Sequence, residues 1–152
     1  MNDFFSQFKT LLSVWDALGR KNLSVDNKIV AEFERELARY LGAKCVIGVA
    51  SGTDALILAL KAFGVEPGDE VIVPAVSAFS TAGAVKWLNA VPVFVDVKPD
   101  DMNMDPGKIE TAITDRTKAV VAVHLNGRMA EMDMISAIAK RHKLVLIEDA
   151  AQ

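Results

Sequence analysis

The sequence predicts an α/β fold with a mainly parallel sheet and helices on both of its faces. Three observations favour this fold. From residue 44 onward, short apolar runs typical of buried strands alternate with segments whose apolar residues recur at helical spacing. Turn signals such as Pro67-Gly68-Asp69 separate them. Strands that alternate with helices form right-handed β-α-β crossovers, which give a parallel sheet.

Residues 1–25 are predicted to form an N-terminal helix and a linker, ahead of an α/β domain at 26–152. Apolar residues from Phe4 to Trp15 fall at helical spacing, and Gly19 follows as a stop signal. The helix carries too few charges for lipid binding, so packing on the body of the domain or on a partner subunit is the preferred interpretation.

A second helix carries Ile29, Phe33 and Tyr40 on one face and ends at Gly42. The rest of the chain alternates. Strands are expected at 45–49, 70–73, 91–97, 118–123 and 144–147. Helices are expected at 53–63, 79–88, 105–113 and 131–140. The third of these helices opens with Asp105-Pro106, a cap followed by a proline at the first helical position.

Composition narrows the class of protein. The chain has 152 residues, of which 51% are apolar and 24% charged, enough for one domain with a core. A net charge of −3 argues against nucleic acid and anionic membranes as partners. The single cysteine, Cys45, excludes an intramolecular disulfide and indicates a reducing compartment. With no signal peptide or transmembrane stretch evident, we expect a cytoplasmic protein.

Polar residues follow the predicted strands directly, where parallel sheets bind ligands. They are Ser51-Gly52-Thr53, Ser77, His124 with Asn126, and Glu148-Asp149. Ser51, Gly52 and Thr53 open a helix, whose first N–H groups lack partners and favour an anion such as phosphate. Simple helix capping explains the same three residues, and both interpretations stay open.

Asp149 ends a strand that its apolar pattern places in the interior, buried on both faces. A buried carboxylate needs a partner, either a structural one such as a helix N-terminus or a protonated ring nitrogen. Pyridoxal phosphate requires such a carboxylate to keep its ring charged. His124 has a structural interpretation and a ligand-binding one. No metal site, nucleophile elbow, Walker loop or dinucleotide motif is present.

Six segments in this order resemble the DegT/DnrJ/EryC1/StrS family of sugar aminotransferases, which are fold-type I pyridoxal-phosphate enzymes. The segments are S-G-T-D-A-L (51–56), P-G-D-E-V-I-V-P (67–74), P-V-F-V-D-V (92–97), V-H-L-N-G (123–127), M-D-M-I-S-A-I-A (132–139) and I-E-D-A-A-Q (147–152). The resemblance covers about residues 26–152. It implies that the sheet is an incomplete version of the family's large cofactor-binding domain.

The resemblance also implies roles for individual residues. Ser51, Gly52 and Thr53 would hold the cofactor phosphate, Asp149 would pair with the ring nitrogen, and Gln152 would contact the ring hydroxyl. The family's aromatic residue that stacks on the ring falls at Ala78, so either Phe79 replaces it or the stack is lost. Ser77, His124 and Asn126 would face the substrate, although the family has an aromatic residue at 126 and a small one or Pro at Met129.

The family's Schiff-base lysine lies beyond the Asp-x-x-Gln motif, and therefore beyond Gln152. The resemblance implies that the full-length protein is a homodimer that aminates a nucleotide-linked keto-sugar, with glutamate as the amino donor. A lysine-free sugar dehydratase of the same fold, in which histidine replaces that lysine, is the alternative. A third hypothesis is a non-catalytic truncated chain, and the 152 residues as written are expected to be inactive.

Overall fold

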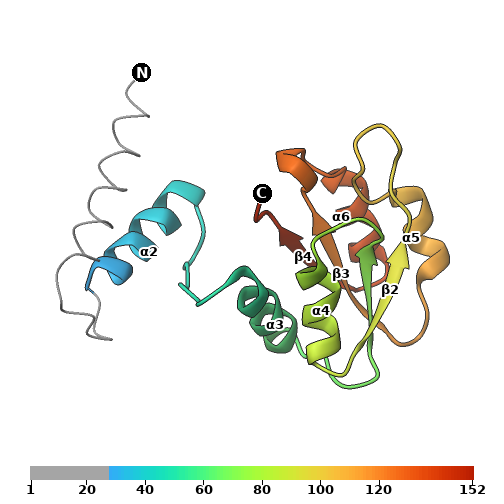
Figure 1. Cartoon of the computed structure of the whole chain (residues 1–152), viewed down its shortest axis with the longest axis horizontal. Helices are drawn as coiled ribbons and strands as arrows, with labels where there is room; N and C mark the ends of the chain where they lie inside the picture. The colour runs from blue at the N-terminus through green and yellow to red at the C-terminus, as the bar shows by residue number, and fades with distance from the viewer. Residues whose placement is uncertain (1–27) are drawn as a thin grey trace. The chain divides into compact units, whose positions relative to one another are not determined.

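The computed structural model describes residues 28–152 (Figure 1). The chain divides between Gly48 and Val49 into two compact units. The predicted helix within 1–25, and the boundary placed at residue 26, lie outside the described residues and stay predictions. Every helix within the described residues is too short or too polar to cross a bilayer.

The first unit contains one described helix, α2 (Lys28–Leu41), and no residue of this helix is buried. It ends as predicted at Gly42, whose positive φ of 64° suits glycine. The predicted strand at 45–49 is wrong, because these residues join no ladder in the described chain and are mostly exposed. Instead, the Gly48 N–H donates a hydrogen bond of 2.6 Å to the Glu34 carboxylate. An apolar run forms a strand only where a neighbouring strand accepts its backbone hydrogen bonds.

The second unit holds a sheet of four parallel strands in the order β2-β1-β3-β4, as predicted. The strands are β1 (Glu70–Pro74), β2 (Val91–Val95), β3 (Thr117–Val123) and β4 (Val145–Asp149). From β1 the chain first adds β2 on one side and then returns to add β3 on the other. The carboxyl ends of β1 and β3 therefore meet at a topological switch point, where such sheets form ligand crevices.

Helices cover both faces of this sheet, also as predicted (Figure 1). They are α3 (Gly52–Ala62), α4 (Phe79–Trp87), α5 (Pro106–Ala112) and α6 (Met132–Arg141). A short 3₁₀ turn, η1 (Leu125–Gly127), follows β3. Asp105 caps α5 through the Gly107 N–H at 2.8 Å, and Pro106 occupies the first turn. The predicted cap and first-turn proline of α5 are therefore confirmed.

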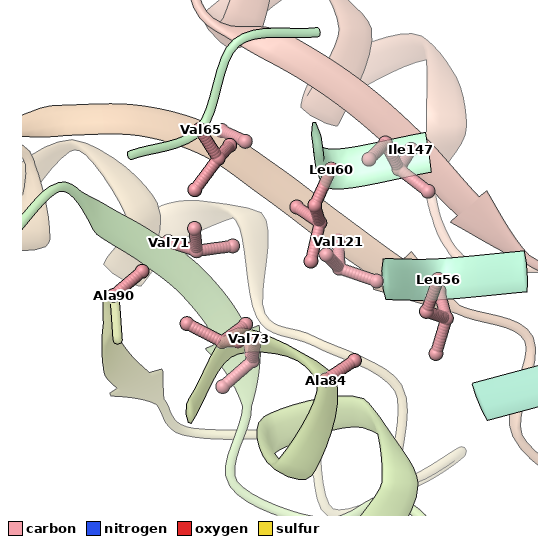
Figure 2. Packing of buried hydrophobic residues seen from close by; sticks show 11 residues of the cluster. Leu56, Leu60, Val65, Val71, Val73, Ala84, Ala90, Val121 and Ile147 are labelled. Atoms are coloured by element: carbon pink, nitrogen blue, oxygen red, sulfur yellow. The ribbon is translucent and has the colours of Figure 1, made fainter. Parts of the chain in front are cut away.

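Two apolar clusters fix these helices to the sheet. One joins α3 and α4 to one face, and Figure 2 shows Leu60 of α3 beside Val121 and Ile147 of the sheet, with Leu56 in the same cluster. The other joins α5 and α6 to the opposite face around Ile72. Because the C-terminus of α3 leads into the start of β1, α3 runs antiparallel to the strands. Its N-terminus therefore lies at the carboxyl edge of the sheet.

The prediction that the last strand is buried on both faces is wrong. Within the described chain β4 pairs with β3 alone, and only Ile147 of the strand is buried. Glu148 is exposed and Asp149 is half-buried. The apolar pattern predicted the strand itself correctly, but a pattern cannot reveal on how many sides a strand has neighbours.

Candidate functional site

The N-terminus of α3 forms an anion-binding cradle at the carboxyl edge. Ser51 caps the helix: its Oγ accepts the Asp54 N–H at 3.1 Å and donates to Asp54 Oδ2 at 2.9 Å. The N–H groups of Gly52 and Thr53 precede the first intrahelical bond, which the Ala55 N–H makes to the Ser51 carbonyl. They are therefore free to hold an anion. Capping by Ser51 therefore leaves the amides of Gly52 and Thr53 available for an anion, and the two interpretations are compatible.

The surroundings of this cradle leave room for a ligand. A groove of about 550 Å³ lies beside it, lined in part by Ser51, Thr53, Ile57 and Trp87. A Cβ atom built on Gly52 would meet nothing within 4 Å. The open amide donors suit a phosphate. Asp149 and Gln152 do not line this groove, so it is the amides and not the groove that favour a phosphate.

Asp149 is oriented by two donors at the end of β4. The Thr81 hydroxyl donates to its Oδ2 at 3.3 Å, and the Ala151 N–H donates to its Oδ1 at 3.2 Å. Thr81 is buried in the first turn of α4, and its hydroxyl connects that helix end to the carboxylate. The expected partner near a helix N-terminus is therefore present. The carboxylate is half-buried, so one side stays accessible to a cationic ligand.

His124 is buried and engaged at both ring nitrogens. Its Nδ1 accepts the Ala130 N–H at 3.3 Å, and its Nε2 lies 3.2 Å from Glu148 Oε2. These two contacts suit the tautomer that donates from Nε2 and accepts at Nδ1. The structural interpretation of His124 accounts for all of these contacts.

Asn126 and Gln152 meet at the same edge. The Asn126 N–H donates to the Gln152 side-chain oxygen. Asn126 has a φ of 55°, in the left-handed region that Asn adopts more readily than most residues. Backbone geometry thus supplies a reason for asparagine at this position that is independent of any substrate.

Ser77 and Phe79 lie where β1 gives way to α4. The Ser77 hydroxyl donates to the Ala78 carbonyl at 3.3 Å. Phe79 is 91% exposed, and its ring lies close to Gly83 one turn along the helix. Ala78 provides no side-chain cap for α4. An exposed aromatic ring is therefore present at the edge, next to the position where the family has one.

Three polar residues escaped the sequence analysis: Thr81, Asn103 and Glu148 as a partner of His124. Thr81 lies one turn into a helix that starts at the carboxyl edge, so its position was a usable signal. Asn103 is buried in a loop and bonds to residues more than 20 positions away. No local pattern indicates contacts of that kind.

One buried carboxylate lies away from this edge. Glu70 begins β1 at the amino edge and is buried there. Hydrogen bonds from Thr114 and Arg116 hold the pKa of Glu70 below its usual value, and burial opposes them. This ion-paired cluster is structural. Within residues 28–152, no group of three His, Cys, Asp or Glu side chains is arranged to hold a metal ion.

Comparison with known proteins identifies the class. The model of the DegT/DnrJ/EryC1/StrS aminotransferase family matches residues 9–152, and the chain belongs to this family. Aminotransferases of this family depend on pyridoxal phosphate. The edge described above fits that cofactor, because it places open amide donors and an oriented carboxylate on one rim of the sheet.

Particular relatives are similar over most of the chain. A pleiotropic regulatory protein of Geobacillus stearothermophilus is 46% identical over 100% of this chain and 41% of its own length. A UDP-2-acetamido-2-deoxy-3-oxo-D-glucuronate aminotransferase of Pseudomonas aeruginosa is 50% identical over 81% of this chain and 34% of its own length. The chain therefore spans about two fifths or less of these relatives.

Solved structures agree with the fold. The ntda protein of Bacillus subtilis, crystallised with bound cofactor PMP, superposes with a TM-score of 0.88 and 40% identity. The match covers 97% of this chain and 34% of that protein. The parallel sheet with helices on both faces is therefore part of a pyridoxal-phosphate aminotransferase fold, as the sequence predicted.

Proposed function

We propose that the full-length protein is a pyridoxal-phosphate-dependent nucleotide-sugar aminotransferase that moves an amino group from glutamate to a keto-sugar. The observation that supports this best is the meeting of two unlike groups at one edge of the sheet. The open N–H groups of Gly52 and Thr53 suit a phosphate, and the oriented carboxylate of Asp149 suits a protonated ring nitrogen.

Each group at the edge has a defined task. Gly52 and Thr53 donate backbone N–H bonds to the phosphate, while Ser51 keeps the helix end capped around them. Asp149 would accept the ring N–H and stabilise its charge. When bound, the cofactor supplies an electron sink for the carbon that loses a proton. Gln152 has its oxygen engaged by the Asn126 N–H, which leaves its amide nitrogen to donate to the ring hydroxyl.

The remaining candidates surround that position. We propose that Phe79 supplies the stacking ring, since its side chain is exposed at the edge and Ala78 offers none. Ser77 and Asn126 are the proposed sugar contacts. His124 is proposed to hold the chain next to Asn126 in place and not to bind the sugar itself, because both of its ring nitrogens are already engaged.

The lysine that attaches to the cofactor is proposed to lie beyond Gln152, in the part of the relatives that this chain does not span. Lys86 and Lys140 lie near the ends of α4 and α6, are exposed and are not at strand ends. The 152 residues alone are therefore proposed not to transaminate. The full-length protein is proposed to be a cytoplasmic homodimer, as the family resemblance implies.

The test is to express the full reading frame with pyridoxal phosphate and record the absorption spectrum before and after borohydride reduction. The proposal expects a bound-cofactor band that reduction abolishes, one lysine carrying the reduced cofactor by mass spectrometry, and transfer of ¹⁵N from glutamate to a keto-sugar nucleotide. A spectrum unchanged by borohydride with no modified lysine would overturn it. Turnover of a sugar nucleotide without a modified lysine would indicate the dehydratase instead.

A further inference from the structure

The loop between β2 and α5 carries a buried polar side chain that no step above uses. Asn103 is only 2% exposed, although it lies in an irregular segment. A buried amide side chain is costly unless its donor and acceptor atoms are paired. Its bonding partners therefore indicate why this residue is in the interior.

Asn103 bonds to both ends of η1. Its side-chain oxygen accepts the Leu125 N–H at 3.0 Å, and its side-chain nitrogen donates to the Arg128 carbonyl at 3.1 Å. These two backbone groups lie on either side of Asn126 and Gly127. A single planar amide thus spans the turn and holds its two ends at a fixed separation.

Asn103 is itself firmly placed. Its N–H donates to Asp101 Oδ1 at 2.9 Å, and its carbonyl accepts the Lys98 N–H at 2.9 Å. The next residue, Met104, is fully buried and forms an isolated bridge with Val97. The loop therefore ties the side chain of Asn103 to the core and does not merely follow η1.

The turn has an unusual backbone. Asn126 has a φ of 55° and Gly127 a φ of 75°. Asn and Gly adopt this left-handed conformation more readily than other residues, and the Asn103 amide then fixes the two ends of the turn. The residues around η1 also contact the end of β4. The Asn126 N–H donates to the Gln152 side-chain oxygen, and the His124 N–H donates to the Asp149 carbonyl at 3.1 Å.

We propose that Asn103 is a positioning residue for the cofactor edge: its side-chain amide clamps η1 in the shape that orients Gln152 beside Asp149. The clamp itself rests on hydrogen bonds of the chain alone. Only the identity of the ligand whose site it orients rests on the proposed function.

The clamp is tested by hydrogen exchange at single amides of the chain without cofactor. Asn103→Ala removes both bonds, and Asn103→Asp keeps an acceptor for Leu125 but lacks the donor for Arg128. Ile135→Val, in the fully buried core of α6, serves as the control for general loss of stability. At matched global stability, we expect Asn103→Ala to speed exchange of the Leu125 and Asn126 amides about tenfold relative to the control, because each loses a supported hydrogen bond.

Asn103→Asp should keep slower exchange at Leu125 than Asn103→Ala does. Equal exchange in the alanine variant and the control would overturn the clamp. In the full-length protein, pyridoxamine phosphate should bind about tenfold more weakly to Asn103→Ala than to the Ile135→Val control. Faster exchange of the Leu125 and Asn126 amides together with an unchanged affinity for pyridoxamine phosphate would overturn the positioning role. Absence of binding in the unaltered protein would refute the proposed function, and the exchange data would still decide the clamp.

Discussion

Thr81 offers a sharp test of how Asp149 is oriented. Thr81 is 1% exposed, and its hydroxyl donates to Asp149 Oδ2 at 3.3 Å across 68 positions of sequence. Thr81→Val removes that donor and preserves the β-branched shape. The core around the first turn of α4 should therefore stay packed while the carboxylate loses one of its two donors.

The magnitude follows from the geometry. Hydrogen bonds to charged groups contribute about 1.5–3 kcal/mol. A hydroxyl donor at 3.3 Å is longer than an ordinary O–H···O bond, and Asp149 is half-buried, so water replaces part of the loss. We therefore expect about 1 kcal/mol, which corresponds to about fivefold weaker binding of pyridoxamine phosphate.

The assay is an absorption or fluorescence titration of the full-length protein with pyridoxamine phosphate. Thr111→Val is the matched control, because Thr111 is an exposed residue of α5, on the opposite face of the sheet, and its hydroxyl donates to the Lys108 carbonyl. Thr81→Ser keeps the hydroxyl and should bind like the unaltered protein. Equal affinities for Thr81→Val and Thr111→Val would refute the idea that Thr81 orients the carboxylate.

Three further predictions concern stability. Leu60→Ala, at a fully buried position between α3 and the sheet, should lower the free energy of unfolding by about 2–5 kcal/mol in urea titrations; a loss below 1 kcal/mol would contradict the packing. Asn126→Val should lower the free energy of unfolding by about 1–2 kcal/mol, because a β-branched residue resists a φ of 55°. Asn126→Gly should be nearly neutral, and equal losses in the two variants would contradict the left-handed turn. The pKa of Glu70 is lowered on folding by Thr114 and Arg116, so the stability that this carboxylate contributes is present above its ordinary value of 4.5 and is lost as pH falls through its lower folded value. Melting temperatures from pH 7 to pH 3 should therefore fall less steeply in Glu70→Gln, and parallel curves would contradict this cause.

The sequence predicted the fold wherever one segment carried its own signal. Helical spacing, the Asp105-Pro106 cap and Gly42 placed helix ends within about two residues, because caps and left-handed glycines act locally. Alternation of strands and helices then predicted a parallel sheet covered on both faces. The same logic places the start of α3 and the end of β4 at the carboxyl edge, and a ligand shared by Thr53 and Asp149 stays a prediction.

Features that depend on distant partners could not be predicted. The run at 45–49 has strand composition but no ladder in the described chain, and β4 has a neighbour on one side only. Asn103 gains its role from a contact 22 positions away, and nothing near it in the sequence signals that role. The place of Thr81 near a helix start was a signal, but its partner lies 68 positions away. Tertiary context overrides local preference in each of these cases.

The central claim is that the amides at the start of α3 and the carboxylate at the end of β4 bind one ligand. It is tested most directly by titrating the ¹⁵N-labelled chain with pyridoxamine phosphate and following backbone amide shifts. Gly52, Thr53 and residues 150–152 should shift together with one dissociation constant, and inorganic phosphate should shift only the first two. Different dissociation constants for Gly52 and Thr53 and for residues 150–152 would contradict a shared site. The absence of any shift at residues 150–152 would contradict it as well.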